Sequence, residues 1–300
     1  MNNAVRTDLA LEARELWREG AAAGEALAGV EAHEIARGAI TVSAVDILDA
    51  EGERALGKPR GRYVTVELDA LARREENAFA DACAAISEQL NSLLKLENNG
   101  SVLVAGLGNR GITPDAVGPE TIDWVMATRH LKQTLPEDFA AFRPVSAVCS
   151  GVLGTTGVES GELIAAVAER VQPNAIIAID ALAARSIDRL CRTVQLSDTG
   201  IVPGSGVGNA RTALSRETIG VPVIAVGVPT VVDAGTLVAD LARSAGLDAE
   251  SAAMRGGEKL IVTPRDIDKN IRDAAKLIGY SINLALHNGL TLADVDVLLS

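Results

Sequence analysis

Hydrophobic and polar positions follow one pattern up to about residue 97 and another beyond it. In the first part, apolar residues alternate with polar ones at 40–44 and at 63–68, which predicts two strands. The polar stretch 51–61 lies between them, so we expect a hairpin. Helical spacing of apolar residues predicts helices over 8–19 and 71–96.

From residue 101 the chain alternates between short apolar runs and helical patterns. The apolar runs cover 101–108, 144–151, 174–180 and 221–229. The helical patterns cover 116–131, 160–171, 181–191 and 265–287. Strands that are apolar throughout and alternate with helices are typical of a sheet covered on both faces. We therefore predict an α/β fold with a mostly parallel or mixed central sheet flanked by helices, in one domain whose core is 98–300 and whose N-terminal elaboration is 9–97.

Composition narrows the classes of protein that fit. Of 300 residues, 48% are hydrophobic, which excludes wholesale disorder. Two Trp, two Tyr and three Phe are too few for a base-stacking surface, and a net charge of −12 argues against direct nucleic-acid binding. The same charge attracts a basic protein substrate. Three widely spaced cysteines and the lack of an apolar stretch of ~18 residues predict a cytoplasmic protein without disulfides or membrane contact.

Two aspartates follow apolar runs of the predicted sheet. Asp115 lies in the long loop after 101–108, and Asp180 directly ends the run 174–180. Ligands bind where such strands end, so neighbouring strands would bring both carboxylates to one cleft. A carboxylate pair can hold one proton and activate water, which needs no metal or other cofactor. Alternatively, each aspartate is only the N-cap of the helix that follows it.

Two glycine-rich loops are candidates for backbone donors to an oxyanion. The first contains Gly154 and Gly157, and the second contains Gly204, Gly206 and Gly208. The second loop could instead bind phosphate or be a flexible surface loop, but it lacks the Lys-Ser/Thr ending of a phosphate-binding loop. No GxSxG motif is present, and Cys149 and Cys191 have no histidine nearby in sequence, which disfavours nucleophilic hydrolysis.

Several motifs together resemble the germination protease family of spore-forming Firmicutes. They are RTDLALEA at 6–13, GLGN and TPDAVGP within 106–119, GVLGTTGVE at 151–159, IDALAARS at 179–186, QLSDTGIVPGSGVGNAR at 195–211 and GVPVIAVGVPTVVDA at 220–234. The resemblance extends in order along nearly the whole chain. Ser150, the pair Arg110-Gly111 and a short segment at 235–261 differ from the family pattern.

The resemblance implies an endopeptidase of the atypical aspartic type, with a fold like that of hydrogenase maturation endopeptidases. It would degrade small acid-soluble spore proteins during germination, act in the forespore or spore core, and form a homotetramer. Asp115 and Asp180 match the two essential aspartates of the family. The family is made as a zymogen that removes its own propeptide. Residues 1–8 would be that propeptide, with cleavage between Asp8 and Leu9 at an exposed, frayed helix end.

Two other functions are compatible with the same residues. The related maturation endopeptidases bind metal at the equivalent cleft, so a metal-dependent peptidase is the first alternative. A non-enzymatic protein that binds nucleotide or phosphate through its glycine loops is the second.

Overall fold

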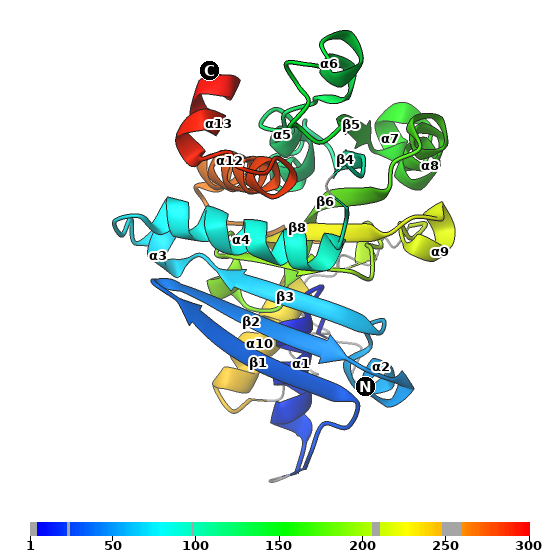
Figure 1. Cartoon of the computed structure of the whole chain (residues 1–300). Helices are drawn as coiled ribbons and strands as arrows, with labels where there is room; N and C mark the ends of the chain where they lie inside the picture. The colour runs from blue at the N-terminus through cyan, green and yellow to red at the C-terminus, as the bar shows by residue number, and fades with distance from the viewer. Residues whose placement is uncertain (1–4, 23–24, 98, 206–210, 248–259) are drawn as a thin grey trace.

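The computed structural model describes residues 5–22, 25–97, 99–205, 211–247 and 260–300. Within these ranges, nine strands form one mixed sheet in the order β1-β2-β3-β7-β8-β6-β4-β5, with β9 paired to β8 (Figure 1). The strands are β1 Val30–Arg37, β2 Ile40–Ile47, β3 Gly61–Glu67, β4 Val102–Leu107, β5 Val145–Gly151, β6 Ala175–Ala184, β7 Thr193–Ser197, β8 Val223–Asp233 and β9 Ile261–Val262.

The sheet has a parallel part and an antiparallel part. Strands β5, β4, β6 and β8 are parallel to their neighbours within that group, whereas β1, β2, β3 and β7 pair antiparallel. Figure 1 shows β1 to β3 as the blue and cyan end of the sheet. The strands of the N-terminal elaboration therefore join the same sheet as those of the core.

Helices cover both faces of the parallel part of the sheet, and others lie beside the antiparallel part. The helices of the described residues are α1 Ala10–Gly20, α2 Ala50–Leu56, α3 Asp69–Ala72, α4 Ala78–Leu94, α5 Val117–Ile122, α6 Arg129–Thr134, α7 Leu153–Thr156, α8 Ser160–Val171, α9 Arg216–Ile219, α10 Ala234–Ser244, α12 Ile267–Leu286 and α13 Leu292–Leu299. Helices α4 and α12 pack together over one face. Helix α8 covers the other face. The predicted α/β fold with a mixed central sheet flanked by helices is confirmed.

Strand β4 shows why these runs are apolar throughout. Val102 and Val104 pack into the cluster under α4 and α12, while Leu103 and Ala105 pack into the cluster under α8. Successive side chains of a strand point to opposite faces, and both faces are covered here. A strand in this position needs an apolar residue at every place.

The predicted helix over 181–191 is wrong. Strand β6 continues to Ala184 because β8 extends beside it as far as Asp233, and a short 3-10 helix, Ile187–Arg189, follows. Strands β2 and β3 are adjacent and antiparallel as expected, but α2 lies in their connection. The predicted helix over 71–96 is divided into α3 and α4 by a turn in which Arg74 and Asn77 have positive φ. The predicted helix over 116–131 is likewise divided, into α5 and α6.

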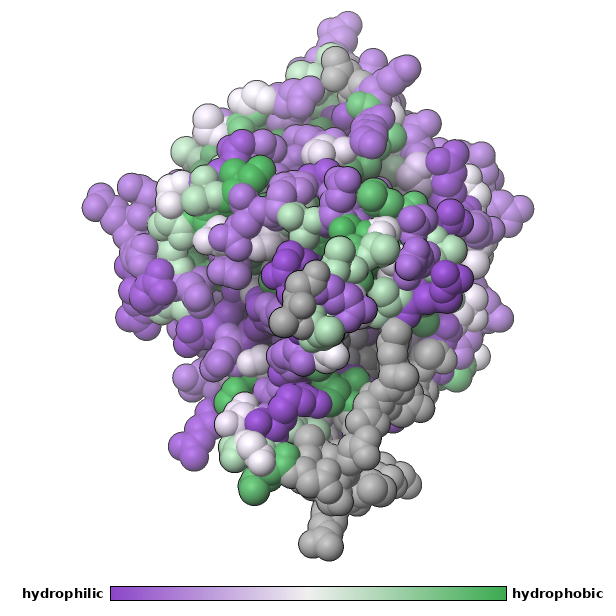
Figure 2. Space-filling model, turned by 90° about the horizontal axis from the view of Figure 1, so that it is seen from below, coloured by the Kyte–Doolittle hydropathy of each residue, from purple (hydrophilic) through white to green (hydrophobic). Residues whose placement is uncertain are grey.

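No helix in the part of the chain that the structure describes is both long and apolar enough to cross a bilayer. The face of the molecule seen in Figure 2 is mostly hydrophilic, with hydrophobic residues scattered over it. Scattered single hydrophobic residues are normal on a protein surface and need no partner to explain them.

Candidate active site

Asp115 is held by the loop that follows β4. It ends a 3-10 turn, Thr113–Asp115, and its Oδ2 accepts a hydrogen bond from the Asn109 N–H at 2.8 Å. The same N–H also lies 3.0 Å from the Asp115 carbonyl oxygen. Thr230 on β8 donates its hydroxyl to the Pro114 carbonyl at 2.7 Å, which ties the turn to the sheet. These contacts fix where the carboxylate lies.

Gly108 is required for this loop. Its φ is +105°, and a Cβ there would lie 2.1 Å from the Asp115 carbonyl oxygen. Only glycine adopts such a conformation without strain and leaves room for so close an approach. The loop can therefore fold back on the end of β4.

Asp180 lies on β6 just beyond the end of its pairing with β4. The last paired residues are Gly106 and Ile179, so β6 continues past its neighbour. The Asp180 side chain is 5% exposed, and its Oδ1 accepts a hydrogen bond from the Ala181 N–H at 2.9 Å. A buried carboxylate with one such bond is poorly solvated.

The structure brings Asp115 and Asp180 into one pocket of about 490 Å³. Strands β4 and β6 are neighbours, and each aspartate follows the end of their shared ladder. The rest of the pocket lining is largely apolar and includes Leu107, Leu182 and Val231. Apolar walls lower the local dielectric constant and so strengthen the electrostatic interaction between the two carboxyl groups.

The surroundings raise the pKa of both carboxyl groups. For Asp180, burial raises the pKa well above its ordinary value of 3.8, and the nearby charges of Asp115 and Asp8 raise it further. For Asp115, burial raises the pKa while the hydrogen bond from Asn109 opposes the change. Two carboxyl groups in these conditions favour a state in which the pair holds one proton.

Neither aspartate is a helix cap. The N-cap of α5 is Ala116, and Asp115 accepts its hydrogen bond from the loop instead. Asp180 lies within strand β6, which continues to Ala184. The interpretation of these two residues as helix N-caps is therefore wrong, and helix capping does not explain why they lie in the pocket.

The predicted glycine donors are distributed unevenly around the pocket. Gly204 lines it. Gly206 and Gly208 lie outside the described residues. Gly154 and Gly157 are not among the lining residues, and the Gly157 N–H is already bonded to the Leu153 carbonyl at 2.9 Å.

The described residues contain no group of three or more His, Cys, Asp and Glu side chains arranged to hold a metal ion. Asp115 and Asp180 therefore lack a third protein ligand of these types within the described ranges. Catalytic metal sites usually use three protein ligands.

The N-terminal segment lies against the same pocket, a contact that sequence reasoning did not foresee. Asp8 lines the pocket, and its N–H donates to the Ala183 carbonyl on β6 at 2.9 Å. Leu9 and Ala10 are 0% exposed. The expectation of an exposed, frayed helix end at the bond between Asp8 and Leu9 is therefore wrong.

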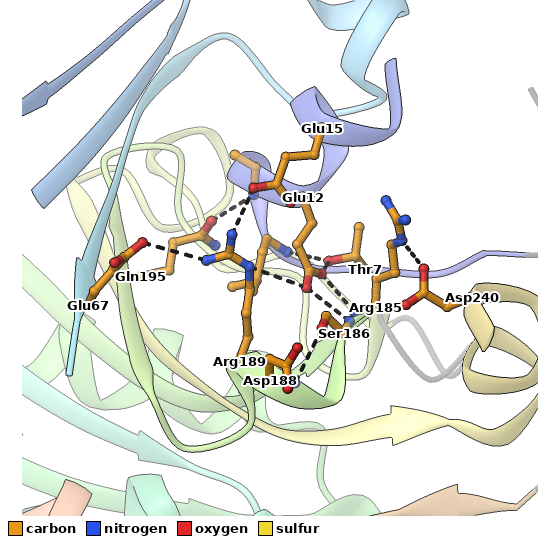
Figure 3. A network of polar contacts seen from close by, with 12 residues as sticks. Thr7, Glu12, Glu15, Glu67, Arg185, Ser186, Asp188, Arg189, Gln195 and Asp240 are labelled. Carbon is orange, nitrogen blue, oxygen red and sulfur yellow. Dashed lines mark hydrogen bonds and ion pairs between the residues drawn. The ribbon is translucent and has the colours of Figure 1, made fainter. Parts of the chain in front are cut away.

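Beside the pocket, a polar network joins α1 to the chain just after β6 (Figure 3). Glu12 is 1% exposed and accepts hydrogen bonds from the backbone N–H groups of Arg185 at 2.6 Å and Ser186 at 3.1 Å. Thr7 also donates to it, and Arg189 lies 3.7 Å away. Burial raises the pKa of Glu12, although these four groups oppose the change. The network anchors the start of α1 on the segment that directly follows the strand carrying Asp180.

The family model for the germination protease matches residues 10–243. A germination protease of Caldanaerobacter subterraneus subsp. tengcongensis is 41% identical over 98% of this chain and 98% of its own. That of Clostridium tetani is 40% identical over 97% of this chain and 98% of its own. A NiFe-hydrogenase maturation protease of Thermococcus kodakarensis, 14% identical, covers 65% of this chain and 98% of its own with a TM-score of 0.37.

The pocket with its two carboxyl groups on an α/β sheet is a site suited to hydrolysis, and the matched family is one of peptidases. The chain belongs to the germination protease family. It is therefore a protease of spore germination, and the resemblance seen in the sequence is confirmed.

Proposed function

We propose that this chain is an atypical aspartic endopeptidase that degrades small acid-soluble spore proteins, with Asp115 and Asp180 as its catalytic pair. The observation that supports the pair is their meeting in one pocket with the pKa of Asp180 raised by burial and by Asp115. One proton shared between two carboxyl groups supplies both a base and an acid.

In this mechanism a water molecule lies between the two carboxyl groups. Ionised Asp115 takes a proton from the water molecule while the water oxygen bonds to the carbonyl carbon of the scissile peptide bond. Protonated Asp180 gives its proton to the amide nitrogen, and the C–N bond then breaks to release an amine and a carboxylic acid. The proton on Asp115 then passes to Asp180, which restores the starting state of the pair. Backbone N–H groups around Gly204, which lines the pocket, would stabilise the oxyanion.

Substitution of either aspartate tests the pair. Asp115→Asn and Asp180→Asn should each abolish cleavage of a purified small acid-soluble spore protein. Mass spectrometry of the products measures this cleavage. Asp123→Asn is the matched control because this side chain is 58% exposed, pairs with Arg110 and is not among the residues that line the pocket. Full activity in either of the first two variants would refute the mechanism.

Self-processing is part of the proposal. The chain would be made as a zymogen that removes residues 1–8 by cleaving between Asp8 and Leu9. Because protonated Asp180 is needed, processing should be faster at pH 5.5 than at pH 8. Intact-mass measurement of the full chain over time follows the loss of the segment, and an equal rate at both values would contradict the role of Asp180.

A metal-dependent peptidase at the same cleft remains the alternative. The described residues offer no three-ligand cluster, so we expect activity to survive dialysis against a chelator. Elemental analysis of the active protein distinguishes the two mechanisms. Thermal-shift measurements with nucleotides and inorganic phosphate test the non-enzymatic alternative, which predicts stabilisation by those ligands and no cleavage.

We further propose that the enzyme assembles as a homotetramer and acts in the spore core, as its family membership suggests. Light scattering coupled to size-exclusion chromatography measures the assembly. The chain has 28 Lys and Arg against 40 Asp and Glu, and this negative net charge favours the approach of a basic protein over direct contact with DNA.

A further inference from the structure

The pocket that holds Asp115 and Asp180 has a positively charged side chain in its wall. Among the described residues that line it, Arg211 is the one that carries a positive charge. Arg211 follows β7 in the chain, so it comes from a segment other than those that carry the two aspartates. An arginine side chain is always charged in proteins. The pocket therefore combines a pair of carboxyl groups with one permanent cation.

Two contacts hold Arg211 in this position. Its backbone N–H donates to the Pro203 carbonyl at 3.1 Å, and Pro203 and Gly204 line the same pocket. Its Nη1 donates to Oε1 of Glu159, just before α8, at 3.0 Å. Both side chains of this ion pair are 28% exposed, so solvent screens the pair only in part. The guanidinium is thus tethered at one nitrogen while Arg211 forms part of the pocket wall.

The ion pair with Glu159 leaves Arg211 available to a ligand. Within the described residues, the contact with Glu159 is the one hydrogen bond that this side chain donates, and a guanidinium has further N–H groups on its other nitrogens. Among the same residues, no arginine contributes to the pKa shift of Asp115 or Asp180. A cation in contact with an aspartate would favour its ionised form. Arg211 therefore does not displace the proton that the carboxyl pair must hold.

Hydrolysis of a peptide bond places new negative charge on the carbonyl oxygen. As the water oxygen bonds to the carbonyl carbon, one electron pair of the C=O double bond moves onto the carbonyl oxygen, and it returns when the C–N bond breaks. This charge is poorly solvated in a largely apolar pocket, so a cation that contacts it lowers the barrier. The neutral peptide group of the bound substrate gains much less from the same cation.

We propose that the guanidinium of Arg211 contacts the developing oxyanion, and that Glu159 is a positioning residue that orients it. Arg211 adds a positive charge to the backbone donors around Gly204. The inference rests on the proposed peptidase function, because it assigns a residue to that reaction. It requires that Arg211 act on the transition state rather than on the resting substrate, which separates it from a role in peptide binding.

Arg211→Gln is the first test. The parent and variant full-length chains are given a purified small acid-soluble spore protein, and initial rates yield kcat and KM separately. The variant should lose about a hundredfold or more in kcat with little change in KM, because a donor to the oxyanion is removed. An unchanged kcat would overturn the proposal, and a rise in KM alone would show that Arg211 binds the substrate in its ground state.

Chemical rescue tests whether the charge itself is responsible. Free guanidinium ions at a non-denaturing concentration should restore activity to Arg211→Ala but not to Asp115→Asn. Arg211→Lys should retain more activity than Arg211→Gln, because it keeps the charge. A lack of rescue together with equal activities of the Lys and Gln variants would show a structural role and overturn the proposal.

Arg192→Gln is the matched control. Arg192 is 53% exposed, pairs with Asp69 and is not among the residues that line the pocket. This variant should keep the kcat of the parent chain. A loss equal to that of Arg211→Gln would show that removal of any arginine lowers activity, and would overturn the assignment.

Glu159→Gln tests the positioning role. Loss of the ion pair should lower kcat about tenfold at unchanged KM, because the guanidinium keeps its charge and loses its fixed direction. The double variant with Arg211→Gln should be no slower than Arg211→Gln alone, since residues that act as a unit do not have additive effects. Independent losses that multiply would refute the action of Glu159 through Arg211.

Binding of a transition-state mimic needs no turnover. The probes are two uncleavable peptides that copy residues 5–14, with the peptide bond after Asp8 replaced by a tetrahedral, negative phosphinate or by a neutral ketomethylene group. The protein is the full chain with Asp8→Ala, so that its own segment competes less for the pocket. Adding Arg211→Gln should weaken binding of the phosphinate peptide about a hundredfold and of the ketomethylene peptide less than about threefold, as measured by calorimetry.

The binding and kinetic results distinguish the two ways in which the inference can fail. Equal weakening of both peptides, or no binding of either peptide before Arg211 is changed, would overturn the role of Arg211. If the phosphinate result holds while no chain cleaves a spore protein, the peptidase function fails and the anion site at Arg211 stands.

Discussion

Asp180→Asn should change the pH dependence of stability as well as abolish activity. Burial and the charge of Asp115 raise the pKa of Asp180 in the folded protein well above 3.8, the ordinary value that the unfolded chain retains. Asn keeps an oxygen that can accept the bond from Ala181 N–H, now 2.9 Å long, and it cannot ionise. The variant therefore removes the titration with little change in shape.

The direction of the change in stability follows from the number of protons that the folded and unfolded states bind. Above pH 3.8 the unfolded chain loses the Asp180 proton while the folded protein keeps it, so the free energy of unfolding falls as pH rises. The fall is at most about 1.4 kcal/mol per pH unit and stops at the folded pKa. Asp180→Asn does not suffer this loss, so it should become more stable than the parent chain as pH rises and then reach a constant difference.

The difference in free energy of unfolding between the two proteins can be measured by urea unfolding, with intrinsic fluorescence as the signal. Measurements at half-unit steps from pH 4 to pH 9 cover the expected change. Glu12 and Glu67 also titrate with raised pKa, but both proteins contain them, so their contributions cancel. Asp115 also titrates with a raised pKa and interacts with Asp180, so the final difference divided by about 1.4 kcal/mol gives the shift in pKa of the pair. Parallel curves for the two proteins would refute the raised pKa and, with it, the role of Asp180 as an acid.

Two further predictions concern the scaffold of the site. Gly108→Ala should cost about 2 kcal/mol or more of stability and most of the activity, because the added methyl would meet the Asp115 carbonyl at 2.1 Å and φ is +105°. Gly154→Ala, with nothing within 4 Å of the new methyl, should be neutral or slightly stabilising in the same urea unfolding assay. Glu12→Gln should cost about 1–3 kcal/mol, because both carboxylate oxygens accept backbone N–H bonds. Glu15→Gln, 42% exposed, should cost less than about 1 kcal/mol, and equal losses for Glu12 and Glu15 would contradict the buried network.

The parallel part of the fold could be predicted because its signal is local. Runs such as 101–108 and 174–180 are apolar at every position, and that pattern has one common explanation in a covered sheet. Helix α8 was predicted with its observed bounds, 160–171, for the same reason: its apolar positions repeat with helical spacing. Strand β1 was missed because it lies at the edge of the sheet and is largely exposed.

The segment after Asp180 shows the limit of such reasoning. Its alanines and helical spacing favour a helix over 181–191, yet β6 continues to Ala184 because β8 pairs with it there. Pairing with a strand more than forty residues later overrides local preference. The same long-range pairing explains why β6 outlasts β4, which no local pattern could indicate.

The two aspartates could be found from the sequence, but their partners could not. Asp115 and Asp180 stand at strand ends, where a general rule directs attention. The contacts of Asp8 with Ala183, Gln195 and Ser205 join positions 175 to 197 residues apart, and the sequence motifs that contain these residues do not indicate that they meet. Only the folded arrangement reveals them.

The unequal lengths of β4 and β6 have a consequence for what this protein can attack. A chain that docks by main-chain bonds to β6 must first be straightened, so helices and compact loops are spared until they loosen. The stability of the target's fold would then determine whether it is cleaved, before any of its side chains is recognised. We expect a loosely structured polypeptide to be consumed while a tightly packed neighbour in the same compartment survives.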